Sequence, residues 1–547
     1  MVKWDSTDQK GARGTPTCSF WSFVRILIFG RIKTLAKHLV YDVHETPKFG
    51  KMLIFALQQL LAILAATIAV PSIIGLPTQI PAAIFGAGVG TLIYQLFTRF
   101  KSPVFLGSSF AFLSSLSVAV AYGYCGIVLG SVVAGLAYVV IAIIIKLVGT
   151  GWVNKLLPPV IIGPTVALIG LNLAVNAMND IVKANSDNIN GSYNLVALLC
   201  GLITFITVVI CSSQKKYQMP RLIPFIIGIC AGYAAASVFT VIGNATNTEY
   251  LQIIDWSAVV NNFVDKAGNF RGFEAFLSVP DFSIVEAIKE LVSGGSFSEA
   301  IINANTNVND PSLSVIPTML DAGSILTVVV AFLPVALVVF AEHIADHKNL
   351  STIIDKDLIN DPGLDSTLLG DGVGSIAGTL CGVCPNTTYG ESVGCVAITK
   401  NASVSTITTT AIMCMALSFI SPVMTVLQTI PSCVMGGVCL TLYGFIAVSG
   451  LKMFKDIDLG ENKNLFVVSS ILISGIGQLS LRIPYEIASN GKVLSVITVT
   501  NIATALIIGI ITNFILTKIE KSKLGVAPAE ETAEDAPVTE KAEEEVE

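Results

Sequence analysis

Long apolar segments follow one another along most of the chain. Each is close to the length of about 20 residues that an α-helix needs to cross the hydrocarbon core of a bilayer, and we count about fourteen of them. They are residues 52–71, 80–98, 103–120, 125–147, 156–177, 193–212, 222–242, 322–343, 369–384, 386–399, 405–426, 433–451, 464–480 and 493–516. Only 13% of the 547 residues are charged, against about 25% in an ordinary soluble domain. The sequence therefore predicts an all-α polytopic membrane protein.

Two of these segments, 103–120 and 386–399, are interrupted by glycines and polar residues. The second begins within Pro385-Asn386-Thr387-Thr388-Tyr389-Gly390-Glu391, which follows a long apolar run. In lipid, a broken helix is tolerated only where it is buried in protein or lines a wet cavity. A glutamate at such depth is by default a functional-site hypothesis. We therefore expect the substrate site at residues 385–391.

An internal repeat links the two interrupted segments. Residues 86–92 (GAGVGTL) resemble residues 370–376 (GDGVGSI), and each copy precedes one interrupted segment. The second copy lies seven predicted spans after the first, and this odd offset inverts its orientation in the membrane. Paired Gly/Pro-interrupted segments in corresponding halves predict the binding site of a secondary transporter. The alternative is that glycine-rich helices resemble one another by composition alone.

Basic residues fall on alternate loops. They are Arg99, Lys101, Lys146, Lys155, Lys215, Lys216, Arg221, Lys348, Lys356, Lys400, Lys452 and Lys455. By the positive-inside rule, both termini are predicted to be cytoplasmic. Residues 1–50 form a basic extension for which we expect an interfacial helix, and residues 519–547 form an acidic, disordered tail. The polar loop 244–316 is expected to be exterior, as a small cap or a disordered insertion. No basic patch interleaved with aromatic residues indicates nucleic-acid binding.

Acidic and histidine residues cluster at the end of the eighth predicted span, at Glu342, His343, Asp346 and His347. Two histidines four residues apart suggest an intramembrane metallohydrolase. However, zinc proteases carry the glutamate between the histidines, so this enzyme interpretation is disfavoured and no metal is expected. We expect His343 and His347 at the solvated cytoplasmic end, and Glu342 deeper in the span.

Glu342 and Glu391 are the two acids that we place within the apolar spans. A buried, unpaired carboxylate tends to take up a proton, because its charged form is poorly solvated. A protonated carboxyl group both donates and accepts, which suits a ligand edge of alternating N–H and C=O groups. The site can then bind a proton together with a neutral substrate. The alternative for each glutamate is a structural hydrogen bond between helices.

At these residues the sequence resembles the nucleobase–ascorbate transporter family, in the form carried by its bacterial uracil permeases. The resemblance rests on residues 385–391, 341–344, 106–112 and 442–444, and on residues 42–50 near the start. It covers about 41–517, apart from the exterior loop, and implies two inverted seven-helix repeats with broken third and tenth spans. The core domain would comprise residues 51–148 and 317–428. The gate domain would comprise residues 149–243 and 429–518.

The resemblance also implies roles for individual residues. Glu342 and Glu391 would hydrogen-bond the pyrimidine, and the backbone N–H groups of Phe110 and Gly390 would complete the contacts. The remaining expected pocket residues are Tyr389, Tyr443, Ala66, Ser109 and Asn386. The implied activity is proton-coupled uptake of uracil across the plasma membrane by alternating access, in a homodimer and without a cofactor. A xanthine or other purine permease on the same fold is the alternative, and Na⁺ in place of H⁺ stays open.

The sequence departs from the family at two positions. Gln59 stands where many members have histidine, and Asp346 stands where a uracil permease has histidine one turn after the first glutamate. In those permeases the histidines are taken to support the glutamate and its proton. Here we expect Gln59, Asp346 and the neighbouring His347 to serve proton coupling together with Glu342.

Overall fold

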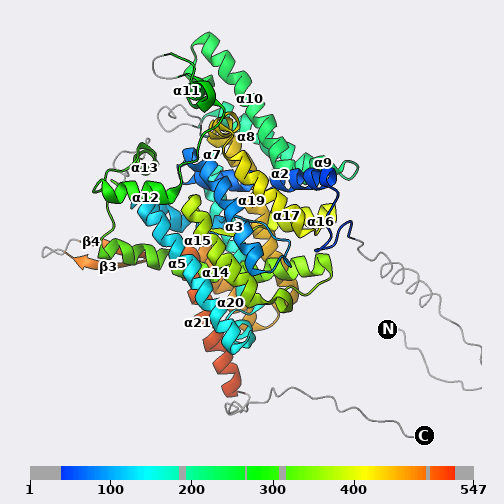
Figure 1. The fold of residues 1–547 in the computed structure, drawn as a ribbon. Helices are drawn as coiled ribbons and strands as arrows, with labels where there is room; N and C mark the ends of the chain where they lie inside the picture. The colour runs from blue at the N-terminus through cyan, green and yellow to red at the C-terminus, as the bar shows by residue number, and fades with distance from the viewer. Residues whose placement is uncertain (1–38, 184–192, 265–267, 307–315, 488–492, 524–547) are drawn as a thin grey trace, which may run out of the picture.

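The computed structural model describes residues 39–183, 193–264, 268–306, 316–487 and 493–523, and it is predominantly helical (Figure 1). Within these residues, nine helices are long and apolar enough to cross a membrane. They are α2 (Phe49–Ile73), α3 (Ile80–Phe97), α5 (Gly123–Val148), α7 (Pro159–Asp180), α8 (Leu195–Ser212), α10 (Pro224–Thr246), α14 (Ala322–Ile354), α19 (Ser432–Lys452) and α21 (Asn501–Lys523). The predicted helical membrane protein is confirmed, while the count of fourteen spans stays a prediction.

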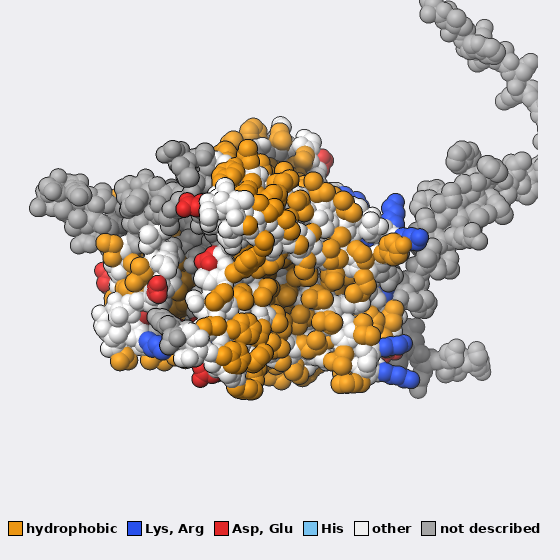
Figure 2. Space-filling view, turned by 90° about the horizontal axis from the view of Figure 1, so that it is seen from above, with side chains coloured by type: hydrophobic (Ala, Val, Ile, Leu, Met, Phe, Trp, Pro, Cys, Tyr) orange, Lys and Arg blue, Asp and Glu red, His pale blue; other side chains and the backbone are white. Residues whose placement is uncertain are grey.

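The surface fits this assignment. Large apolar side chains such as Val140, Leu147 and Ile206 are more than half exposed on α5 and α8. Figure 2 shows hydrophobic side chains over most of the visible face, with Lys and Arg gathered mainly at its right margin. In a lipid environment these exposed apolar side chains contact acyl chains rather than water.

The two interrupted segments cross each other as short strands. The first consists of β1 (Leu106–Ser108), a 3₁₀ turn η2 (Phe110–Phe112) and the short helix α4 (Leu113–Val120). The second consists of β2 (Asn386–Thr388) and the half-helix α16 (Gly390–Thr399). The strands pair antiparallel, with Gly107 opposite Thr387. The predicted interruption of both segments is therefore confirmed, and the pairing satisfies backbone groups that lipid would leave bare.

The helices pack in two groups. In the first, α15 (Leu364–Cys381) lies against α3 and α5, α14 packs on α5 and α4, and α17 (Val404–Leu417) packs on α3 and α2. Small residues allow the close approach of α3 and α15, since a Cβ at Gly90 would lie 2.8 Å from the carbonyl oxygen of Gly374. In the second group, α19 packs on α7 and α8, α10 packs on α8, and α20 (Asn462–Ile476) packs on α7 and α21. Contacts of α2 with α19 and α10 lie on the seam between the groups.

The loop predicted at 244–316 forms short helices over its described residues. These are η4 (Glu249–Leu251), α11 (Ser257–Phe263), η5 (Gly272–Ala275), α12 (Ser283–Val292) and α13 (Glu299–Asn305). α12 packs on α5 and α15, and α11 packs on α18 (Ser421–Gln428). The loop was expected to be either a small cap or a disordered insertion, and its described residues form a small cap. We call residues 249–305 the cap; α12 and α13 lie at the left end of Figure 1, and α16 lies at the right end.

Two segments differ from the predicted spans. The span predicted at 493–516 is wrong in its first part, because β4 (Val493–Val499) pairs antiparallel with β3 (Leu481–Ile487) and α21 begins only at Asn501. Hydropathy does not distinguish a strand from a helix, and the β-branched run of β4 favours the strand. The span predicted at 405–426 is split into α17 and α18, with Pro422 in the first turn of α18. The predicted interfacial helix in residues 1–38 and the acidic tail from 524 lie outside the described residues.

Candidate functional site

The candidate site is built on the crossing of β1 and β2. Asn386 Nδ2 donates to the carbonyl oxygen of Gly86 at 2.9 Å, which fixes the start of the second segment to α3. The Tyr389 hydroxyl donates to the Ser108 carbonyl oxygen at 3.0 Å and lies 3.3 Å from Thr67 Oγ1. Asn386 and Tyr389, both predicted site residues, are thus buried and held by backbone carbonyl groups of α3 and β1. They position the half-helix α16.

Three carboxyl groups gather beside this half-helix. Glu342 and Asp346 lie one turn apart on α14, and Glu391 lies in the first turn of α16. All three are half-buried and close enough to interact electrostatically. Asp346 Oδ2 accepts a hydrogen bond from Thr388 Oγ1 at 2.8 Å. The structure therefore brings the two predicted glutamates together and adds Asp346, which is anchored to β2.

Open space borders the start of α16. Gly390 is exposed, and a Cβ there would meet no atom within 4 Å. Gly390 and Phe110 are the first residues of α16 and η2. Their N–H groups are among those that have no carbonyl partner within the helix. Such a helix start offers hydrogen-bond donors and a partial positive charge to a carbonyl oxygen.

Aromatic side chains close the site on the side of the second helix group. The rings of Phe110 and Tyr443 meet edge to face, with their centroids 5.5 Å apart. Tyr443 comes from α19 and is buried, and its hydroxyl has no nitrogen or oxygen partner among the described residues. Ala66 and Ser109 are also buried, and Ser109 N donates to the Pro385 carbonyl oxygen at 3.0 Å. The site therefore lies on the seam between the two helix groups.

Gln59 reaches the site through a serine. Its Nε2 atom donates to Ser392 Oγ at 2.5 Å, and the same oxygen accepts from the Phe105 backbone N–H at 3.2 Å. Gln59 therefore fixes the residue next to Glu391, and its amide nitrogen is used there rather than at Glu342. Sequence reasoning missed Ser392, although it belongs to the same polar stretch.

The prediction that His343 and His347 are solvated is wrong, because both side chains are fully buried. His343 Nδ1 lies 2.7 Å from Asp371 Oδ2, and Nε2 lies 3.1 Å from Thr367 Oγ1. The reason is the length of α14, whose 33 residues continue to Ile354 and place both histidines well inside the helix. A hydropathy window ends the helix at the first charged cluster and so places it at the surface.

His347 belongs to the same buried network. Its Nδ1 atom faces the His343 carbonyl oxygen at 2.8 Å, and Nε2 lies 2.7 Å from the Tyr94 hydroxyl. A carbonyl oxygen only accepts, so Nδ1 carries a proton at this contact. The two imidazole rings stack with centroids 4.1 Å apart. His347 therefore points toward α3 and contacts neither glutamate through these hydrogen bonds.

Comparisons with known proteins agree with this geometry. The model of a family described as a permease family, Xan_ur_permease, matches residues 50–482. The chain belongs to this family, the nucleobase–ascorbate transporters. The uracil permease of Bacillus caldolyticus is 33% identical over 480 residues, which cover 87% of this chain and 94% of that one. The uracil permease of Bacillus subtilis is also 33% identical, over 88% of this chain and 96% of its own.

A solved structure shows the same fold at low identity. The murine anion transporter Slc26a9, in its inward-facing state, superposes with a TM-score of 0.54 at 10% identity. The alignment covers 93% of this permease and 74% of that chain. The relatives of this chain are named permeases, and these names together with the nine apolar helices identify an integral membrane transporter rather than an enzyme.

A fourth acid, Asp371, lies buried near the site and was not predicted. We placed only Glu342 and Glu391 within the apolar spans, but Asp371 on α15 has no exposed side-chain surface and bonds His343. The internal repeat already marked Asp371 as unusual in the sequence. The repeat copy 370–376 carries Asp371 where the first copy carries Ala87.

Proposed function

We propose that this permease takes up uracil together with a proton, by alternating access. The observation that carries the proposal is the pairing of Glu342 and Glu391, two half-buried acids on different elements beside the crossing of β1 and β2. Curated relatives of the same family are named uracil permeases. An anion site would instead favour a Lys or Arg beside the half-helices.

Uracil matches the chemistry of these groups. Its ring is uncharged, and its edge alternates C=O and N–H groups. A protonated glutamate can donate to a carbonyl oxygen and accept from an N–H group. In the proposed complex Glu342 and Glu391 bond this edge, and the N–H groups of Phe110 and Gly390 meet a ring carbonyl. Tyr389, Tyr443, Ala66 and Ser109 form the walls, and Asn386 holds the crossing in place.

The coupling proton is proposed to reside on the carboxyl cluster. Like charges this close disfavour full ionisation, so Glu342 and Asp346 would share a proton. The Thr388 hydroxyl already bonds Asp346 and would hold it in place. Glu342 would then be free to turn to the substrate. Gln59 and His347 would influence the carboxyl cluster indirectly, Gln59 through Ser392 and His347 through α14. We propose H⁺ as the coupling ion, and the uptake assay must distinguish it from Na⁺.

The proposed architecture has fourteen spans in two inverted repeats, with core residues 51–148 and 317–428 moving against gate residues 149–243 and 429–518. The two helix packing groups support this division, because α3, α5, α14 and α15 belong to one and α7, α8, α10 and α19 to the other. Both termini would be cytoplasmic, and the protein would work as a homodimer in the plasma membrane.

Uptake of labelled uracil into liposomes tests the proposal. Uptake should rise when the outside is made more acidic than the lumen, and Glu391→Gln and Glu342→Gln should each reduce it by roughly 100-fold or more. Glu461→Gln is the matched control, since Glu461 lies exposed at the start of α20. Normal uptake by either site variant would refute the site assignment.

The same assay separates the alternatives. Stronger competition by xanthine than by unlabelled uracil would identify a purine permease. Uptake driven by a Na⁺ gradient at equal pH on both sides would identify Na⁺, rather than H⁺, as the coupling ion.

A further inference from the structure

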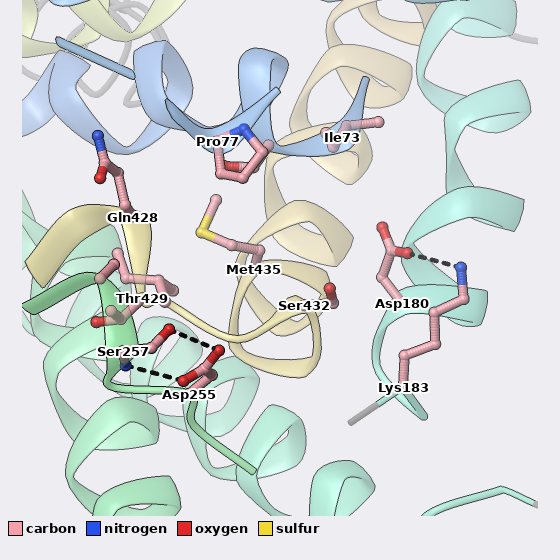
Figure 3. A pocket seen from close by; sticks show the side chains of 13 residues that line it. Ile73, Pro77, Asp180, Lys183, Asp255, Ser257, Gln428, Thr429, Ser432 and Met435 are labelled. Atoms are coloured by element: carbon pink, nitrogen blue, oxygen red, sulfur yellow. Dashed lines mark hydrogen bonds and ion pairs between the residues drawn. The ribbon is translucent and has the colours of Figure 1, made fainter. Parts of the chain in front are cut away.

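A second cavity lies on the seam between the two helix groups, at the end that carries the cap (Figure 3). Its volume is about 490 Å³, within the range of about 300–1,000 Å³ of small-molecule pockets. Its walls come from the C-terminal ends of α2, α7 and α18, the start of α19, and the turn of the cap at Asp255–Ser257. Both helix groups and the cap therefore contribute to one cavity.

The cavity and the candidate site share two helices. On α2, Ser72 of the cavity follows Ala66 of the site by about 9 Å of helix rise. On α19, Met435 of the cavity precedes Tyr443 of the site by about 12 Å. The two helices contact each other along the seam. The cavity therefore lies about 10 Å from the site, in the direction of the cap.

Packed side chains separate the cavity from the site. Between them, Ala69 and Val70 on α2 and Val438 on α19 have no exposed surface, and Cys439 is 1% exposed. A ligand in the cavity therefore reaches the site only after the two helix groups shift. The cavity is therefore placed where a ligand that arrives from the cap side would bind before it reaches the candidate site.

The polar groups of the cavity favour an uncharged ligand. Asp180 Oδ1 and Lys183 Nζ lie 3.6 Å apart and are partly exposed, so an acceptor stands beside a donor with no net charge. On the opposite side, Asp255 is occupied by Ser257, whose N and Oγ donate to it at 2.8 and 2.9 Å. Two carboxylates against one ammonium disfavour a nucleotide or an organic anion. The exposed Ser432 hydroxyl adds a further hydrogen-bonding group.

We propose that this cavity is an outer subsite, in which a nucleobase binds below the cap before the core and gate rearrange. The ring N–H donates to Asp180, and the adjacent carbonyl oxygen accepts from Lys183. The inference rests on the proposed function and extends it to a second position along the same path.

Transport kinetics give the first test. Lys183→Met and Asp180→Ala each remove one partner of the base, and the loss of one hydrogen bond should raise KM for uracil roughly fivefold with kcat nearly unchanged. Lys463→Met is the control, because Lys463 pairs with Glu520 at the surface. An unchanged KM in both variants would overturn the outer subsite. Absence of uracil transport by the unaltered protein would instead overturn the proposed function.

Protection from chemical labelling gives a second test that needs no transport. Ser432→Cys places a thiol in the cavity, and a membrane-impermeant maleimide added from the cap side should label it above the background of the native cysteines. Saturating uracil should slow this labelling even when Glu391→Ala has removed the inner site. Adding Lys183→Met should abolish the protection. Labelling that uracil slows only while Glu391 is intact would show that the cavity holds no base of its own.

Discussion

At the scale of single residues, the site depends on buried polar groups that hold one another. Asp371, His343 and Thr367 form such a set on α14 and α15, without any exposed side-chain surface. Removing one member leaves its partner buried without a hydrogen bond, which costs about 1–3 kcal/mol. His343 follows Glu342 directly on α14, so the set fixes the helix position next to that glutamate.

Replacing the acid of this set should therefore destabilise the protein. Asp371→Ala is expected to lower the free energy of unfolding by about 1–3 kcal/mol, because His343 loses the partner of its Nδ1 atom. The midpoint of thermal unfolding in detergent measures this, with Asp365→Ala at the start of α15 as the control. An unchanged midpoint would contradict a structural role for the pair.

At the residue level, the sequence singled out Glu342 and Glu391, which the structure brings together, because their signal is local. Glu342 and Glu391 stand out because each follows a long apolar run. The burial of His343 and His347 depends on how far α14 continues and on what α3 and α15 place beside it, and neither is visible in the residues themselves. Ser392 bonds Gln59, 333 positions earlier, and Phe105 on the first interrupted segment, so its role required the fold.

At the scale of elements, the crossing of β1 and β2 was foreseen only in part. Glycine, proline and polar residues mark both interruptions, and the internal repeat pairs them. Nothing in either segment fixes the register that sets Gly107 opposite Thr387. The pairing of β3 with β4 was missed, because β4 is as apolar as a membrane helix and falls at the start of the last predicted span.

The crossing makes a strict demand on Gly107. A Cβ at this position would collide with the ring of Tyr389. Gly107→Ala should therefore displace β1 or Tyr389, cost about 1–3 kcal/mol of stability, and strongly reduce uptake. Gly50→Ala is the matched control, since a Cβ there meets nothing within 4 Å. Equal uptake by the two variants would show that the crossing tolerates the extra atom.

At the scale of the whole molecule, α12 and α13 of the cap are fastened to the first helix group, whereas η4 packs on α10 of the second. The Ser283 hydroxyl donates to the Gly382 carbonyl oxygen, just ahead of the site stretch, and Asn305 Nδ2 donates to the Val120 carbonyl oxygen at 2.9 Å. Glu290 is 2% exposed, and its Oε2 atom accepts from the Cys125 N–H at 3.2 Å. Movement of the core would therefore carry α12 and α13 along.

Docking of the cap should depend on pH through Glu290, which lies on α12, outside the apolar helices. Burial raises the pKa of this carboxyl group, and the N–H groups at the start of α5 only partly offset the effect. Docking is therefore strongest below the ordinary pKa near 4.5 and weakens as the pH rises through the raised pKa. Hydrogen exchange of α12 amides, corrected for the intrinsic pH dependence of exchange, should show this loosening. Glu290→Gln should abolish it, whereas exposed Glu274→Gln should leave it unchanged.

The crossing also governs when the site can exist. Ser108 and Tyr389, which bond each other there, are 281 positions apart. A ribosome adding about 5–20 residues per second needs roughly 15–55 s to bridge that gap. During this interval the first half is already in the membrane, but the edge of β1 has no partner. The substrate site is therefore assembled late in biogenesis, and the nascent first half is the stage at which the chain most needs an insertase or chaperone to shield it.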